Sequence, residues 1–129
     1  MKLLLDTHIF LWSLLEPEKL ASETVDLLDD PDIEKYLSAA SSWEIAIKYA
    51  KGFLQLPKPP KHFVTEHVIA AEIMALPITL NDTLAVADLP PIHRDPFDRI
   101  LITQAIQNDM FIVTDDRVFA EYEVRLIDI

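Results

Sequence analysis

The 129-residue chain contains no cysteine and only one glycine. Without cysteine it can form neither a disulfide framework nor a thiolate zinc site, and it has no cysteine nucleophile. A single glycine is too few for the glycine-rich loops that bind phosphate in dinucleotide-binding proteins and in P-loop nucleotide-binding proteins. These absences make nucleotide binding by either loop a poor hypothesis and leave other classes of site open.

A long apolar run is also missing. Residues 1–5 begin like a signal peptide, but Asp6 ends the run far short of the needed length. No other stretch approaches the length of a membrane span. Half of the residues are nevertheless apolar, which predicts a compact core. We therefore expect a single domain over residues 1–129, with a cytoplasmic location and no membrane partner.

Basic residues are scarce relative to acidic ones, with 11 Lys and Arg against 22 Asp and Glu and a net charge of −11. Proteins that bind nucleic acid usually carry a basic excess. Taken alone, the charge favours a basic partner, bound cations or simple solubility.

The apolar pattern predicts short strands that alternate with helices. Strands are expected at about 2–5, 34–39, 73–78, 110–114 and 123–127. Helices are expected at about 6–15, 22–29, 43–51, 62–71 and 81–89, from Pro96 to about 108, and briefly after residue 115. Expected helix boundaries include Ser22 and either Asn81 or Asp82 as N-caps, and Gly52 as the end of the helix over 43–51. This alternation is typical of a layered α/β domain with a mostly parallel sheet.

The helix that begins near Pro96 has an acidic residue on its apolar face, which is the most informative feature of the sequence. Asp95 is the expected N-cap, with proline at the first helical position. On a helical wheel, an apolar arc includes Asp98 at its middle; its other members are Leu101, Ile102, Ala105 and Ile106. A carboxylate on a buried face costs several kcal/mol unless donors or a metal ion pair with it. Asp98 is therefore a candidate site residue.

Other acidic residues follow expected strands, where ligands bind in open parallel sheets. Asp6 follows the first strand, Asp115 and Asp116 follow the strand over 110–114, and Glu44 lies five residues beyond the strand over 34–39. The helix of Asp98 should begin at the same edge. Carboxylates gathered in this way repel one another unless a hard cation such as Mg²⁺ or Mn²⁺ binds them. Such sites act chiefly on phosphate esters.

Each acidic residue also has a purely structural interpretation. Asp6 is equally well placed to cap the helix after it. Glu44 fits a capping box with Ser41 and an ion pair with Lys48. Either Asp115 or Asp116 can cap a short helix while the other points into the site. The histidines, including His8 and His93 near the acidic edge, show no metal-ligand spacing and are interpreted as surface residues or substrate contacts.

Five segments in order carry a more specific signal: LLLDTH at 3–8 with Trp12, SAASSWEIAIK at 38–48, LPI at 76–78, HRDPFDRILITQA at 93–105 and VTDD at 113–116 with Phe119. Together they resemble the PIN-domain ribonucleases, specifically the VapC-type toxins of type II toxin–antitoxin pairs. The resemblance implies a three-layer α/β/α domain with a central, mostly parallel sheet. It also implies that the family's acidic quartet corresponds to Asp6, Glu44, Asp98 and Asp116.

By the same resemblance, the chain is expected to hydrolyse RNA with Mg²⁺ as cofactor, for which Mn²⁺ can substitute, and with a metal-activated water. A homodimer and inhibition by a cognate VapB-type antitoxin are further expectations. Asp6 and Asp98 are then the main metal ligands, and Glu44 and Asp116 complete the set. Thr7 and Thr114 are candidates to orient these carboxylates. Candidate phosphate contacts are Lys48, Arg94 and Arg99.

Two other functions stay open at this point. A non-catalytic module of the same fold that binds RNA or a protein is the main alternative, although such a binder gains nothing from clustered carboxylates. A metal-dependent phosphatase is a weaker alternative, because Asp6-Thr7-His8 lacks the Asp-x-Asp pair of that chemistry.

Overall fold

A computed structural model describes residues 1–128 of the chain. Its centre is a five-stranded sheet in the order β3-β2-β1-β4-β5, in which every neighbouring pair is parallel. The strands are β1 (Lys2–Leu5), β2 (Glu34–Ser38), β3 (Met74–Leu76), β4 (Phe111–Thr114) and β5 (Arg125–Asp128). The predicted parallel sheet is confirmed, and every strand lies where the apolar pattern indicated.

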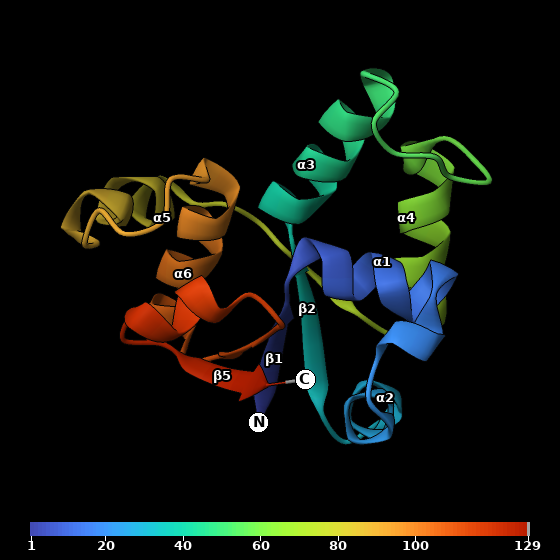
Figure 1. The fold of residues 1–129 in the computed structure, drawn as a ribbon, viewed down its shortest axis with the longest axis horizontal. Coiled ribbons are helices and arrows are strands. Elements are labelled where there is room, and N and C mark those ends of the chain that lie inside the picture. The colour runs from blue at the N-terminus through green and yellow to red at the C-terminus, as the bar shows by residue number, and fades with distance from the viewer. Residues whose placement is uncertain (129) are drawn as a thin grey trace.

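Helices cover both faces of the sheet and complete three layers (Figure 1). One face is covered by α1 (Thr7–Leu15), α2 (Ser22–Asp29) and α4 (Pro60–Ala70), and the other by α5 (Leu80–Ala85) and α6 (Pro96–Asn108). Helix α3 (Ala39–Ala50) continues from the end of β2 and contributes buried residues to both layers. Short 3-10 turns are Pro17–Lys19, Val86–Asp88 and Arg117–Glu121.

The two central strands are buried on both faces, which explains their unbroken apolar sequences. In β1, Leu3 and Leu5 pack in the core beneath α1 and α4, while Leu4 packs in the core beneath α6. In β4, Val113 and Ile112 divide between the same two cores. Each of these side chains is at most 1% exposed, and burying each contributes about 1.5–3 kcal/mol. The sheet edge that carries the site therefore rests on a rigid centre.

The start of α3 differs from the prediction. The helix begins at Ala39 rather than Trp43, and Ser38 is its N-cap, with its Oγ accepting a hydrogen bond from the Ala40 amide at 3.0 Å. The predicted capping box of Ser41 and Glu44 is therefore wrong. Ser38 ends β2 and starts α3 at once, so no turn separates strand from helix. The C-terminus is as predicted, because Gly52 follows α3 with a φ of 78°.

Two other predicted caps are wrong. Ser22 is the first residue of α2 and not its cap. Helix α5 is capped by Thr79, which exchanges hydrogen bonds with Asp82: the Asp82 amide donates to Thr79 Oγ1 at 3.0 Å, and the Thr79 amide donates to Asp82 Oδ2 at 2.9 Å. Asp82 is thus the third residue of a capping box instead of the cap itself.

Helix α6 begins as predicted and buries Leu101, Ile102 and Ala105 of the predicted arc, but the rest of its buried face differs. Asp95 caps it by accepting a hydrogen bond from the Phe97 amide at 2.9 Å. Ile106, expected in the core, is 47% exposed, whereas Thr103 and Gln104 are buried. Gln104 satisfies its amide by accepting from Ser38 Oγ at 2.6 Å and donating to the Pro77 carbonyl at 3.1 Å. Within residues 1–128, no helix has both the length and the apolar character needed to cross a membrane.

Candidate metal centre

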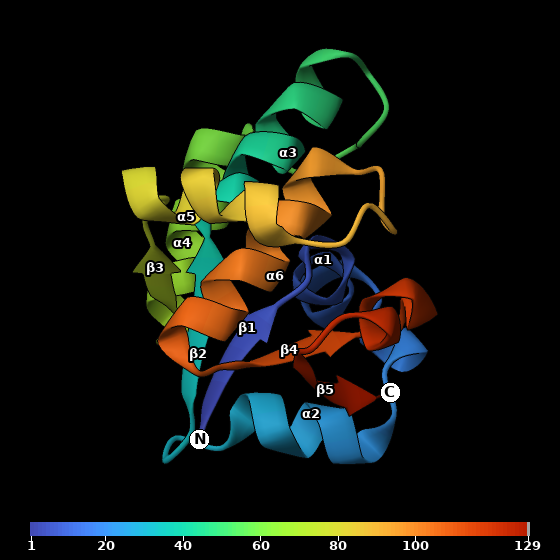
Figure 2. The same cartoon turned by 90° about the vertical axis from the view of Figure 1, so that its left-hand side faces the viewer.

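The carboxylates predicted from the sequence meet at one edge of the sheet. Figure 2 shows that α3 continues beyond the carboxyl end of β2 and α1 follows that of β1, while α6 begins at the same end of the sheet and runs back along it. A cleft of about 370 Å³ opens there. Its lining includes all four residues of the predicted quartet, Asp6, Glu44, Asp98 and Asp116.

Asp6 both caps a helix and faces the cleft, so the two interpretations of this residue do not compete. Its Oδ1 accepts a hydrogen bond from the Thr7 amide at 2.7 Å, and its Oδ2 accepts one from Thr114 Oγ1 at 2.7 Å. Burial raises the pKa of Asp6, while His8 and the two hydrogen bonds act in the opposite direction. Thr114 therefore orients this carboxylate, as expected.

Asp98 carries the strongest electrostatic perturbation of the site. Its side chain is 15% exposed. Burial first, and then the neighbouring carboxylates of Asp6, Asp95, Glu44 and Asp116, raise its pKa from 3.8 to about 8. In the absence of a cation, this carboxyl group therefore keeps its proton at neutral pH. The cluster holds more negative charge than the chain itself neutralises.

Glu44 lies within α3 and is buried, with 7% of its surface exposed. Lys48, one helical turn later, donates from Nζ to Glu44 Oε2 at 2.6 Å. This hydrogen bond raises the pKa of Lys48. One turn before Glu44, Ser41 accepts a hydrogen bond from Thr7 Oγ1 at 2.9 Å, which joins α3 to α1. The hydroxyl group of Thr7 therefore bonds to α3 and does not orient a carboxylate of the site.

The neighbouring acids Asp115 and Asp116 have different surroundings. Asp116 caps the 3-10 turn by accepting from the Val118 amide at 3.0 Å, and it also lines the cleft. Asp115 lies outside this lining and pairs with His8. The sequence predicted that one residue of the pair would cap the turn and the other would face the site, whereas Asp116 both caps the turn and lines the cleft.

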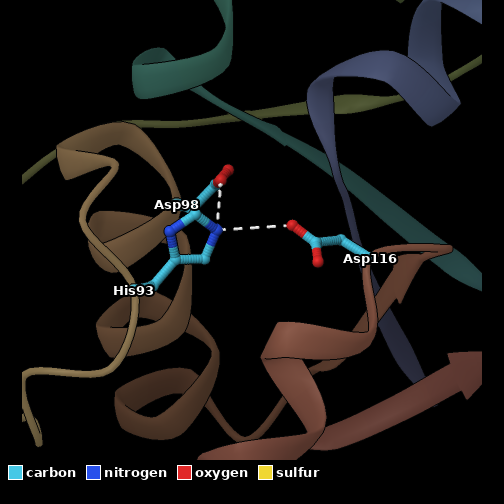
Figure 3. Close-up of side chains that lie close together, drawn as sticks. All are labelled: His93, Asp98 and Asp116. Atoms are coloured by element: carbon cyan, nitrogen blue, oxygen red, sulfur yellow. Dashed lines mark hydrogen bonds and ion pairs between the residues drawn. The ribbon is translucent and has the colours of Figure 1, made fainter.

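Sequence reasoning missed the contacts of two histidines. His8 lies between Asp115 and Asp6, with Nδ1 3.3 Å from Asp6 Oδ2. His93 Nε2 lies 2.9 Å from Asp98 Oδ2 and 3.3 Å from Asp116 Oδ2 (Figure 3). The one sequence signal was closeness to the acidic residues, because neither histidine has the spacing of a metal ligand.

The three candidate phosphate contacts have different surroundings in the structure. Lys48 lines the cleft. Arg94 is exposed on the preceding loop. Arg99 instead donates to the backbone, from Nη1 to the Pro90 carbonyl at 2.9 Å and from Nη2 to the Val86 carbonyl at 3.1 Å. Its guanidinium group therefore fastens the loop before α6.

The residues present fit a hard divalent cation. The quartet supplies carboxylate oxygens, the ligands that Mg²⁺ and Mn²⁺ prefer. The raised pKa of Asp98 reflects, beyond burial, the negative charge of the neighbouring carboxylates, which a cation would neutralise. Both the donor chemistry and the electrostatics of the cleft support a metal site.

Comparison with known proteins gives concordant matches. The sequence model of the PIN domain family matches residues 3–124. Ribonuclease VapC22 of Mycobacterium tuberculosis (strain ATCC 25618 / H37Rv) is 28% identical over 115 residues, covering 88% of this chain and 86% of the relative.

Solved structures show the same fold at low sequence identity. One is VapBC2 from Rickettsia felis bound to a DNA fragment from its promoter, with a TM-score of 0.75, 14% identity, and 100% of this chain and 99% of that chain covered. Another is VapBC-1 from nontypeable Haemophilus influenzae, with a TM-score of 0.66, 17% identity, and coverage of 99% and 98%.

Proposed function

This chain belongs to the PIN domain family, and from that membership we propose that it is a Mg²⁺-dependent endoribonuclease, with Mn²⁺ able to substitute, that acts as a VapC-type toxin. The observation that carries the proposal is the convergence of Asp6, Glu44, Asp98 and Asp116 on one cleft, where the pKa of Asp98 rises to about 8. The similarity to a relative named as a ribonuclease supports the same activity.

In this proposal Asp6 and Asp98 are the principal ligands of the cation, and Glu44 and Asp116 complete the set. A bound Mg²⁺ ion would supply Lewis acidity, which activates water and offsets the charge that develops on the phosphodiester. Asp6 is held for this task by two hydrogen bonds, from the Thr7 amide and from Thr114 Oγ1. Asp116 is likewise held by the Val118 amide.

Lys48 is the cleft residue best placed to contact the substrate phosphate. Its ammonium group lies at the cleft and is 54% exposed at the side chain, while Glu44 fixes its position. It would donate to a non-bridging phosphate oxygen and help an acidic protein to admit RNA. Arg99 is excluded from this task by its hydrogen bonds to the loop carbonyls.

The partners proposed are RNA as substrate, a VapB-type antitoxin and a second copy of the chain. The acidic cleft would suit a basic antitoxin segment. Exposed apolar side chains on α4 and α5, Ile69, Leu80 and Leu84, are between 65% and 76% exposed and offer a surface for dimer formation.

Cleavage of a panel of structured RNAs by purified protein tests the activity. We expect cleavage with Mg²⁺ or Mn²⁺, none in EDTA, and at least a 100-fold loss in Asp98→Asn, with Asp88→Asn as an exposed control that keeps full activity. Cleavage that persists in EDTA or in Asp98→Asn would contradict the mechanism. Calorimetry that detects no Mn²⁺ binding would favour the non-catalytic binding module instead.

A further inference from the structure

His93 makes contacts that are unusual for a residue outside the predicted quartet. Its Nε2 approaches one carboxylate oxygen of Asp98 in α6 at 2.9 Å, and one of Asp116, the cap of the 3-10 turn after β4, at 3.3 Å (Figure 3). The side chain is 15% exposed. One imidazole nitrogen thus joins two carboxylates that come from different elements of the fold.

The other ring nitrogen determines what this contact can be. The Asp95 amide donates a hydrogen bond to His93 Nδ1 at 3.2 Å. An imidazole nitrogen that accepts a hydrogen bond uses its lone pair, so in the neutral ring the hydrogen is carried by Nε2. Nε2–H therefore donates to Asp98 and Asp116. A metal ion needs a nitrogen lone pair, which this arrangement does not present to the cleft.

Tyr122 and Arg99 hold the backbone of His93, which lies in the loop before α6. The His93 amide donates to the Tyr122 hydroxyl at 2.6 Å. Arg99 Nη1 lies 3.4 Å from both that hydroxyl and the His93 carbonyl. The buried Phe119 ring meets the imidazole edge to face, with ring centres 5.8 Å apart. Backbone and ring are thus fixed from several sides, as expected for a group whose direction matters.

We propose that His93 is a positioning residue that holds Asp98 and Asp116 through Nε2–H and stays outside the coordination shell of the cation. This inference rests on the proposed function, because the cation concerned is the one proposed there. In this inference His93 Nε2 orients the carboxylates of Asp98 and Asp116, and all protein atoms that coordinate the cation are oxygens.

Electron spin-echo spectroscopy of the protein loaded with Mn²⁺ tests the coordination directly. We expect no ¹⁴N coupling from a directly bound imidazole in the wild-type protein. A coupling of that kind that disappears in His93→Ala would overturn the inference, since it would make His93 a ligand. The measurement needs no RNA and is independent of nuclease activity.

Calorimetric titration with Mn²⁺ tests the positioning effect. We expect His93→Ala to weaken Mn²⁺ binding about 10–100-fold, the usual cost of removing a group that orients metal ligands. His93→Gln, which can return an N–H donor, should recover most of this loss, and His62→Ala is the control at an exposed histidine. If His93→Ala binds Mn²⁺ as strongly as the wild-type protein, this inference is overturned while the proposed function is not.

Two further measurements separate positioning from loss of folding. Thermal melting in EDTA reports whether each variant is folded, and Tyr122→Phe removes the hydroxyl that accepts from the His93 amide while leaving the imidazole in the chain. We expect Tyr122→Phe to weaken Mn²⁺ binding less than His93→Ala does. A wild-type protein that binds no Mn²⁺ would overturn the proposed function and this inference together, whereas failure of recovery in a folded His93→Gln would overturn only the inference.

Discussion

Replacing Asp98 by Asn should stabilise the metal-free protein at alkaline pH. Burial and the neighbouring carboxylates raise the pKa of Asp98 from 3.8 to about 8 in the folded state. Between these values the folded protein holds a proton that the unfolded chain has lost. Binding of this proton stabilises the folded state fully below pH 3.8, and the stabilisation is lost as the pH rises through about 8. Asparagine has no such proton to lose and keeps nearly the same shape.

The size of the effect follows from proton linkage. One proton bound only by the folded state makes the free energy of unfolding fall by about 1.4 kcal/mol per pH unit. From pH 5 to pH 8 this amounts to at most ~4 kcal/mol, and rearrangement of the carboxylates reduces it to about 2–4 kcal/mol. We expect the stability of Asp98→Asn relative to the wild-type protein to increase by this amount between pH 5 and pH 8.

Urea denaturation in EDTA at several pH values between 5 and 8.5 measures the difference. Asp6 also has a raised pKa and is unchanged in both proteins, so a smaller decline with pH should remain in Asp98→Asn. Asp88→Asn should follow the wild-type curve. Parallel curves for Asp98→Asn and wild type would refute the reasoning, because they would show that Asp98 ionises without cost in the folded cluster.

Adding Mn²⁺ should reverse the order of stability at pH 8. A cation that binds only the folded state stabilises it by about 4.1 kcal/mol at about 1,000 times its dissociation constant, which exceeds the expected advantage of Asp98→Asn. The wild-type protein should gain this stability, and Asp98→Asn should gain little, because it lacks one of the proposed ligands. Equal gains in the two proteins would remove Asp98 from the metal site.

Three further substitutions test contacts that support the site. Thr114→Val removes the hydroxyl that donates to buried Asp6, and we expect a loss of about 1.5–3 kcal/mol in urea denaturation together with weaker Mn²⁺ binding in calorimetry; unchanged binding would contradict the orienting effect. Ser38→Ala removes both the α3 cap and the hydrogen bond to Gln104. We expect urea denaturation to show a loss of about 1–3 kcal/mol of stability, and unchanged stability would contradict the importance of these two bonds. Arg99→Lys cannot reproduce the forked contacts to the loop carbonyls, so amides of residues 86–93 should exchange at least 10-fold faster, and unchanged exchange would show that the loop does not depend on the guanidinium group.

The sheet and the acidic quartet could be predicted because both depend on local signals and on one topological rule. Apolar runs between turn residues marked the strands, and a parallel sheet places the carboxyl ends of its strands at one edge. Asp6 follows β1 directly, and Asp116 follows β4 with one residue between them. Their meeting in space therefore required no knowledge of side-chain packing. Glu44 needed the family resemblance, since its local sequence also suited a cap.

Other features could not be predicted because distant partners determine them. Gln104 lay outside the predicted apolar arc of α6, yet it is buried because Ser38, 66 positions earlier, and the Pro77 carbonyl bond to its amide group. Ile106 is exposed although it lies on the apolar side of the wheel. The contact of His93 with Asp116 spans 23 positions. A wheel or a spacing rule contains no information about such contacts.

The distribution of hydrogen-bond donors explains why the neighbouring carboxylates disfavour the charged form of Asp98 so strongly. Asp6 accepts from an amide and a hydroxyl, Asp116 accepts from an amide and lies near His93, and Glu44 accepts from a charged Lys48. Among residues 1–128, Asp98 has His93 as its hydrogen-bonding partner and several carboxylates as neighbours. The chain thus supplies donors to three carboxylates, and in the proposed function a cation would stabilise the fourth. In the proposed function, Asp98 would be the residue through which cation binding and proton release are coupled.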